Sequence, residues 1–261
     1  MNERIWIVLA IGNSRYHWAW FLNQQLQSSW DTDYFNTELV QASLGILATF
    51  PLALQQEINL ANLTLSDVPI YLVSVVVNQT DIWKKIPQVK QLTLADVPLL
   101  NLYPTLGIDR AIALVGAGAR RGYPVLVIDG GTALTLTGVD QNQRLIGGAI
   151  MPGLRLQLSC LSSQTSALPL VELPLELPTR WSENTDGAIA SGILHTVSSG
   201  LKDFILDWHK LFPQSRIIFT GGDGEILVKY LYSILPEDLI LMIEFNRELI
   251  FTGVGAIVAH K

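Results

Sequence analysis

The feature that most constrains the fold of this chain is a segment, residues 125–140, with the pattern of a strand, a glycine turn and a second strand. An apolar run leads into Asp129, Gly130, Gly131 and Thr132, and apolar residues then alternate to the end of the segment. This pattern predicts a buried strand joined to its neighbour by a tight turn. The bare glycine backbone would let a ligand approach closely, and Thr132 and Asp129 would offer a hydroxyl and a carboxylate. An ordinary Asp-Gly hairpin is the simpler interpretation of this stretch alone.

The N-terminal segment repeats the pattern. An apolar run over residues 5–11 is followed by a turn that begins at Gly12 and by a second alternating stretch. Aligning Gly12 with Gly131 superimposes the two patterns and places Ala10 opposite Asp129. A period of about half the chain suggests two related half-domains rather than a solenoid. Two such hairpins facing each other across a cleft would hold a polyphosphate from both sides, whereas a coincidental pair of hairpins would carry no such meaning.

Composition excludes several classes of protein. The chain has 261 residues, of which 49% are hydrophobic and 15% charged, so it can bury a sizeable core. Its formal net charge of −6 lacks the basic footprint of a nucleic-acid binder. Cys160 is the only cysteine, which excludes an internal disulfide framework and fits a reducing compartment. The apolar N-terminal run is too short for a signal peptide, and no apolar run is long enough to span a membrane. We therefore expect a cytoplasmic protein with no membrane or nucleic-acid partner.

The rest of the chain alternates buried strands with helices, a pattern typical of an α/β protein. Beyond the two hairpins, we expect strands over 69–77, 144–153 and 216–222, and helices over 81–85, 109–121, 154–166, 186–212 and 245–261. The third of these strands ends in Thr-Gly-Gly, where bare backbone would let a flat nucleotide base lie closely.

A carboxylate is expected at the start of the helix over 109–121. As an N-cap, Asp109 would accept backbone N–H groups, a contribution of about 1 kcal/mol. The helix dipole and Arg110 would also hold it ionised, able to orient a hydroxyl and to accept its proton during attack on phosphorus. Arg120 and Arg121 fall at the helix C-terminus, where positive charge is favourable. The four histidines show no metal-ligand spacing, and no role follows for them from the sequence.

Together these motifs resemble one family. The motifs are Gly107-Ile108-Asp109-Arg110, Asp129-x-Gly131-Thr132-Ala133, Gly147-Gly148-x-x-x-Pro152-Gly153-Leu154 and Asn184-Thr185. They are similar to those of type III pantothenate kinase, a branch of the acetate and sugar kinase, heat-shock chaperone and actin superfamily, and they cover essentially the whole chain in the right order. The resemblance implies an α/β fold of two duplicated actin-like, or ribonuclease H-like, half-domains over 1–118 and 119–261. Each would hold a mixed sheet flanked by helices, with an ATP cleft between the two.

The resemblance also implies an activity and a set of residues. The activity is ATP-dependent phosphorylation of pantothenate to 4'-phosphopantothenate, the first step of coenzyme A synthesis, by a homodimer that uses Mg²⁺ and a monovalent cation, K⁺ or NH₄⁺. Asp109 would be the catalytic proton acceptor. Pantothenate would be bound by Tyr103, Gly107, Ile108, Asp109, Arg110 and Thr185. ATP would be bound by Ala10, Ile11, Gly12, Asn13, Ser14, Arg15 and Thr132, and Asp129 would hold the monovalent cation.

Position 10 departs from the family pattern. The first phosphate turn of the family carries Asp where this chain has Ala10, and that carboxylate helps to position the magnesium on ATP. Magnesium in phosphoryl-transfer sites often uses only one or two protein carboxylates, so the loss is survivable at a cost in affinity or rate. Two alternatives stay open: a non-catalytic pantothenate- or nucleotide-binding regulator built on the kinase fold, and a kinase for another small hydroxylated acceptor.

Overall fold

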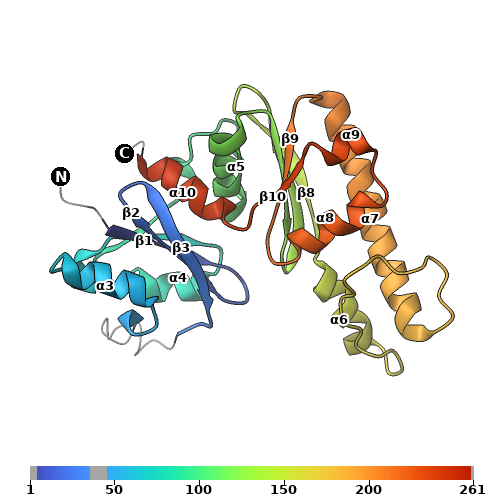
Figure 1. The fold of residues 1–261 in the computed structure, drawn as a ribbon, viewed down its shortest axis with the longest axis horizontal. Coiled ribbons are helices and arrows are strands. Elements are labelled where there is room, and N and C mark those ends of the chain that lie inside the picture. Colours follow the sequence, from blue (N-terminus) through green and yellow to red (C-terminus); the bar gives the residue numbers. More distant parts are fainter. Residues whose placement is uncertain (1–4, 36–45, 260–261) are drawn as a thin grey trace. The chain divides into compact units, whose positions relative to one another are not determined.

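A computed structural model describes residues 5–35 and 46–259 of the chain. The chain divides into two compact units, one made of residues 1–119 with 250–261 and the other of residues 120–249 (Figure 1). The first unit is therefore discontinuous, because the final helix returns to it, whereas the sequence led us to expect that helix in the second half-domain. Within the described residues no helix combines the length and apolar character needed to cross a membrane.

The sheet of the first unit has the strand order β3-β2-β1-β4-β5. Its strands are β1 (Ile5–Ile11), β2 (Tyr16–Leu22), β3 (Gln25–Thr32), β4 (Ile70–Ser74) and β5 (Val89–Gln91). The first three form an antiparallel meander, and β4 and β5 add in parallel beside β1. Alternate residues of β1 and β2 point into one apolar cluster, in which Trp18 and Trp83 are fully buried. The expected hairpin around Gly12 is confirmed.

Helices complete the first unit. They are α3 (Leu52–Leu60), α4 (Val77–Trp83), α5 (Ile108–Arg121) and α10 (Leu249–Ala259), with short 3₁₀ turns at Leu65–Asp67 and Leu94–Asp96. Two glycines fit α10 closely against its neighbours in this unit. A Cβ on Gly255 would lie 3.3 Å from Cε1 of Phe21 in β2, and one on Gly253 would strike the backbone carbonyl of Ile112 in α5.

The strand expected over 69–77 is shorter than predicted, and the helix expected over 81–85 begins earlier. Local hydrogen bonds explain both differences. Ser74 Oγ accepts from the Val76 N–H at 3.1 Å and from Thr80 Oγ1 at 2.7 Å, so the chain turns after Ser74 and enters α4 at Val77.

The second unit repeats the topology of the first. Its strands are β6 (Val125–Gly130), β7 (Ala133–Val139), β8 (Leu145–Pro152), β9 (Arg216–Thr220) and β10 (Ile243–Phe245), in the order β10-β9-β6-β7-β8. The first three are again an antiparallel meander, and β9 and β10 add in parallel. Two mixed sheets of equivalent connectivity confirm the expected duplicated α/β fold. The helix expected over 245–261 is partly wrong, because Phe245 ends strand β10 and the helix begins at Leu249.

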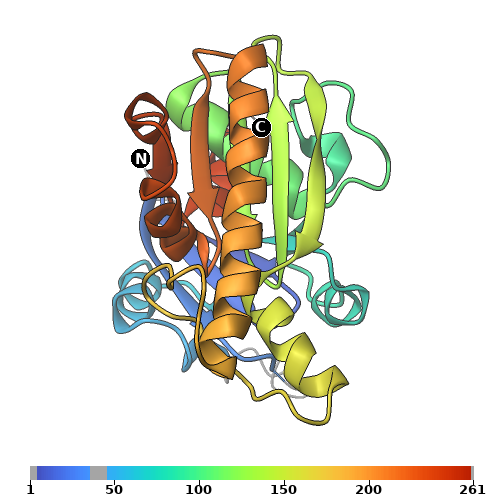
Figure 2. The same ribbon diagram turned by 90° about the vertical axis from the view of Figure 1, so that its right-hand side faces the viewer.

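Helices α6 (Leu154–Gln164), α7 (Thr185–Leu211), α8 (Gly224–Tyr232) and α9 (Glu237–Ile240) belong to the second unit. The long α7 runs along one face of its sheet (Figure 2) and packs Leu194, Leu201 and Ile205 into the core. Gly138 of β7 allows this close approach, since a Cβ there would collide with the ring of Trp208. The helices expected over 154–166 and 186–212 are confirmed to within two residues at each end.

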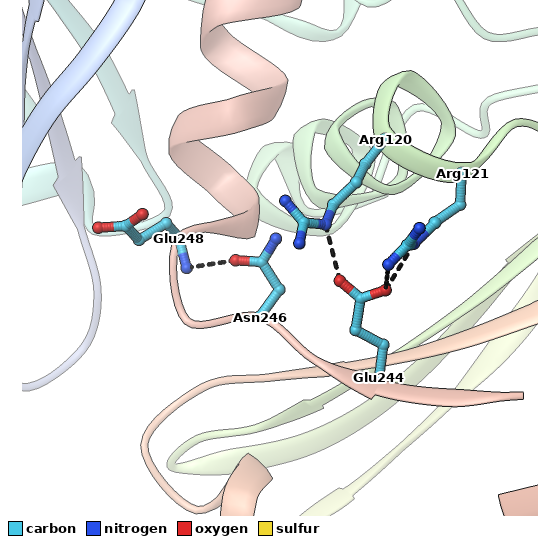
Figure 3. A network of polar contacts seen from close by, with 5 residues as sticks. All are labelled: Arg120, Arg121, Glu244, Asn246 and Glu248. Carbon is cyan, nitrogen blue, oxygen red and sulfur yellow. Dashed lines mark hydrogen bonds and ion pairs between the residues drawn. The ribbon is translucent and has the colours of Figure 1, made fainter. Parts of the chain in front are cut away.

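One ion-pair cluster joins residues far apart in the sequence. Arg120 Nε lies 2.7 Å from Glu244 Oε1, and Arg121 Nη2 lies 2.5 Å from Glu244 Oε2 (Figure 3). Burial raises the pKa of Glu244, but the hydrogen bonds and charges of both arginines outweigh burial and leave its pKa below the ordinary value. Arg120 and Arg121 belong to the second unit with Glu244, so the ion pairs connect the first residues of that unit to its strand β10. Both arginines also lie at the C-terminus of α5, as the sequence suggested.

Candidate functional site

The predicted acceptor residues Tyr103, Gly107, Asp109 and Arg110 lie together at the start of α5. The helix begins at Ile108, so Asp109 stands inside its first turn rather than at the cap position that we expected. The carboxylate folds back: its Oδ1 accepts from the backbone N–H of Arg110 at 2.8 Å. A Cβ on Gly107 would lie only 2.5 Å from the same oxygen, so glycine leaves the room that this rotamer needs.

Electrostatics suit Asp109 to take up a proton. Burial raises the pKa of the Asp109 carboxyl, while the backbone N–H and the positive charge of Arg110 oppose the rise only in part. The guanidinium of Arg110 in turn donates from Nη1 to the hydroxyl of Tyr103 at 3.2 Å. Tyr103 is 40% exposed, so an aromatic face and a cation stand beside the half-buried carboxylate. This arrangement can orient an anionic substrate and accept a proton from its hydroxyl.

The first glycine turn connects β1 to β2. The Gly12 N–H donates to the carbonyl of Arg15 at 3.2 Å, and the hydroxyl of Tyr34 donates to the Gly12 carbonyl. Asn13, Ser14 and Arg15 are exposed at the tip, whereas Ile11 and Ala10 are buried in β1. The exposed tip presents backbone and small polar groups, as the phosphate-turn interpretation requires, and alanine at position 10 brings no carboxylate to it.

The second glycine turn, residues 131–132, is enclosed by two other glycine segments of its unit. The Gly153 N–H donates to the Thr132 carbonyl at 2.9 Å, and the Asp223 N–H donates to the Gly130 carbonyl at 2.8 Å. Gly221 has φ +82°, and a Cβ there would overlap the Asp129 carboxylate. Since α6 starts at Leu154 and α8 at Gly224, the N-termini of two helices lie near this turn. Helix N-termini and bare glycine amides favour bound anions.

Sequence reasoning gave no role to an ion pair that joins these two helix starts. Arg155 Nε lies 2.9 Å from Oδ1 of Asp223, a carboxylate that is only 6% exposed. Arg155 follows Gly153, and Asp223 follows Gly221 and Gly222. The ion pair therefore fixes the spacing of these two glycine segments around Thr132. The acidic residue directly after Thr-Gly-Gly was the available signal. No sequence pattern pointed to Arg155, which lies 68 positions before Asp223.

Thr185 is the first residue of α7 and is exposed. Asn184 caps this helix, and its side chain accepts from the Gly187 N–H at 2.8 Å. The predicted site residues therefore form two groups. Ala10 to Arg15 and the Tyr103 to Arg110 segment belong to the first unit, and Asp129, Thr132 and Thr185 belong to the second.

Solved structures share this fold. The activator of the 2-hydroxyisocaproyl-CoA dehydratase from Clostridium difficile, solved with bound ADPNP, matches with a TM-score of 0.52 and 11% identity over 98% of this chain and 93% of that one. The inorganic polyphosphate/ATP-glucomannokinase from an Arthrobacter species matches with a TM-score of 0.51 and 14% identity over 99% and 100%. These likenesses concern the fold alone, which is that of actin-like ATPases and sugar kinases.

Sequence relatives are much closer. The family model for type III pantothenate kinase matches residues 6–206. Type III pantothenate kinase from a Nostoc species is 42% identical over 98% of this chain and 95% of its own length. The protein of the same name from a Synechocystis species is 44% identical over 98% and 91%. Since the matches span nearly the full length of both partners, the chain belongs to the type III pantothenate kinase family.

Proposed function

We propose that this chain transfers the γ-phosphoryl group of ATP to the terminal hydroxyl of pantothenate, with Asp109 accepting the proton of that hydroxyl. The observation that carries this assignment is the half-buried Asp109 carboxylate, with its raised pKa, held in place by Gly107 and the Arg110 N–H. A base of raised pKa takes a proton more readily, as general-base catalysis requires. Tyr103 and Arg110 would bind pantothenate beside it, and Thr185 stays a predicted pantothenate contact.

The two glycine turns would bind the nucleotide phosphates. In the first unit, the exposed tip from Gly12 to Arg15 presents backbone and side-chain donors. In the second, Thr132 lies among the starts of α6 and α8, whose helix dipoles favour negative charge. Phosphoryl transfer depends almost wholly on positioning and charge stabilisation. Contacts of the two glycine turns with the nucleotide phosphates would therefore account for most of the acceleration of the reaction.

The monovalent cation is proposed to bind at Asp129. Asp129 offers a carboxylate next to the bare backbones of Gly131 and Gly221, an oxygen donor suited to a hard cation such as K⁺. No group of three or more His, Cys, Asp or Glu side chains that could hold a metal occurs in the described part of the chain. Independently of that finding, we propose that Mg²⁺ is held mainly by ATP phosphates and water, where it would neutralise phosphate charge. Asp129 would hold the cation.

We also propose that the protein is a cytoplasmic homodimer. The connector between α6 and α7 exposes large apolar side chains: Leu170 is 67% exposed, Leu175 79% and Trp181 89%. Exposed apolar residues grouped along one connector favour burial against a second subunit. Sedimentation of the protein with and without Trp181→Ser tests this, since a dimer built on the connector dissociates more readily in the variant.

The assay for the function is phosphopantothenate formation by purified protein with ATP, Mg²⁺ and K⁺. We expect turnover in the parent and its loss in Asp109→Asn, which keeps the shape of the side chain but removes the base. The alternative is a regulator that binds these ligands without catalysis, and the alanine at position 10 is the observation that favours it. A silent parent with an active Ala10→Asp variant would support the regulator. Turnover of another alcohol, but not pantothenate, would support a different acceptor.

A further inference from the structure

Three residues near the first glycine turn stand in one row across neighbouring strands. Ala10 of β1 pairs with His17 of β2, and His17 pairs with Asp31 of β3. Directly paired residues on antiparallel strands project from the same face of the sheet. Ala10 is therefore next to a histidine, and that histidine is next to an aspartate.

His17 and Asp31 form a hydrogen-bonded pair. Nδ1 of the imidazole lies 2.7 Å from Oδ1 of Asp31, and the ionised carboxylate can only accept, so Nδ1 donates. Arg15 Nη1 lies 3.7 Å from the other carboxylate oxygen. Asp31, whose side chain is 26% exposed, thereby contacts the tip of the turn and the imidazole at once, and it fixes the orientation of the ring.

The other ring nitrogen faces the turn. A Cβ built on Gly12 would lie 3.4 Å from His17 Nε2, so the imidazole covers the bare backbone of this glycine. The His17 side chain is 41% exposed, which leaves the ring edge accessible to a ligand at the turn. With Nδ1 held by Asp31, Nε2 is the atom that can meet that ligand.

We propose that His17 is a nucleotide-binding residue: its Nε2–H donates to a phosphate oxygen of ATP at the Gly12 turn, with Asp31 as the residue that positions the ring. This inference rests on the proposed function, because it takes the turn to be a phosphate site. When both ring nitrogens donate, the ring is an imidazolium, and it brings positive charge to the polyphosphate.

The test compares His17→Phe, which keeps a flat ring without donors, with His17→Arg, which keeps a charged donor. His209→Phe on α7 is the matched control. Binding of the imido analogue of ATP and of AMP is measured by calorimetry, and KM for ATP and for pantothenate is measured by steady-state kinetics. Hydrogen bonds to charged groups contribute roughly 1.5–3 kcal/mol, so we expect His17→Phe to weaken binding of the analogue at least tenfold. AMP affinity and KM for pantothenate stay within about twofold, and His17→Arg recovers most of the loss, as a charge-assisted donor should.

A measurement on the unaltered protein accompanies the variants, in case His17→Phe folds poorly. The ¹⁵N resonance of His17 Nε2 is expected to shift on addition of the ATP analogue and not on addition of AMP. Equal affinity of His17→Phe and parent for the analogue, an equal loss of AMP binding, or an unmoved Nε2 resonance would each overturn the proposal. A parent that binds the analogue through His17 but does not phosphorylate pantothenate would refute the proposed function and leave this contact in place.

Discussion

Gly107→Ala is a test of how the Asp109 carboxylate, the proposed proton acceptor, is held. The added Cβ would lie 2.5 Å from Oδ1 of Asp109, and ordinary contact begins at 3.4 Å, so the carboxylate must move by about 0.9 Å. A displacement of about 1 Å in a catalytic group can cost about a hundredfold in rate. We therefore expect kcat/KM for pantothenate to fall by roughly 100-fold, equivalent to about 2.7 kcal/mol of transition-state stabilisation.

Stability is expected to respond differently. The obstructed atom is the end of a rotatable side chain, and the Gly107 carbonyl still accepts the Ala111 N–H at 3.1 Å. Replacing glycine by alanine without backbone strain changes the free energy of unfolding by about 1 kcal/mol or less, usually upward. The assay is therefore kcat/KM beside thermal unfolding. Gly192→Ala in α7 is the control, because its Cβ would meet nothing within 4 Å. A Gly107→Ala enzyme with kcat/KM within threefold of the parent would refute the argument that this glycine sets the position of Asp109.

Four further predictions concern charge and packing. Because the pKa of Asp109 is raised above 3.8, kcat/KM should rise with pH through a midpoint above that value, as a pH–rate profile would show. The folded state binds this proton more tightly than the unfolded chain, so stability falls as pH rises through the raised pKa, and Asp109→Asn should unfold at a higher denaturant concentration at pH 7. Glu244→Gln should lose about 1 kcal/mol of stability at neutral pH, a difference from the parent that disappears in titrations below the lowered pKa of Glu244. Gly138→Ala should lose about 1–3 kcal/mol in denaturant titrations, since its Cβ would enter the Trp208 ring.

Much of the fold could be predicted because the signals were local. Each glycine hairpin combines an apolar run, a glycine turn and a strand in which apolar residues alternate, and all three lie within about twenty residues. The strands that we missed carry weaker patterns. Strand β3 is partly exposed along its length, and β5 and β10 are three residues each, too short for any periodicity to be recognised.

The candidate site divides in the same way. Asp109 and its neighbours were predicted from contiguous residues, and the structure brings Tyr103 and Arg110 into contact. We did not predict the pairs Arg155–Asp223 and His17–Asp31, because strand register and tertiary packing create them. Nothing in the spacing of His17 and Asp31 indicates contact until β2 and β3 are known to pair. With Asp109 as the N-cap the helix would begin at Arg110, but it begins two residues earlier, at Ile108, which places the carboxylate inside the first turn.

The return of α10 to the first unit has a consequence for synthesis of the protein. Residues 250–261 leave the ribosome only after the whole of the second unit, 120–249, has been made. The second unit is continuous in sequence and can fold as it emerges. The first unit must wait, with the face of α5 around Ile112 and the face of β2 around Phe21 uncovered, until α10 arrives to cover them. Stalled chains that end before residue 250 should therefore resist protease in their second unit and be cleaved in their first.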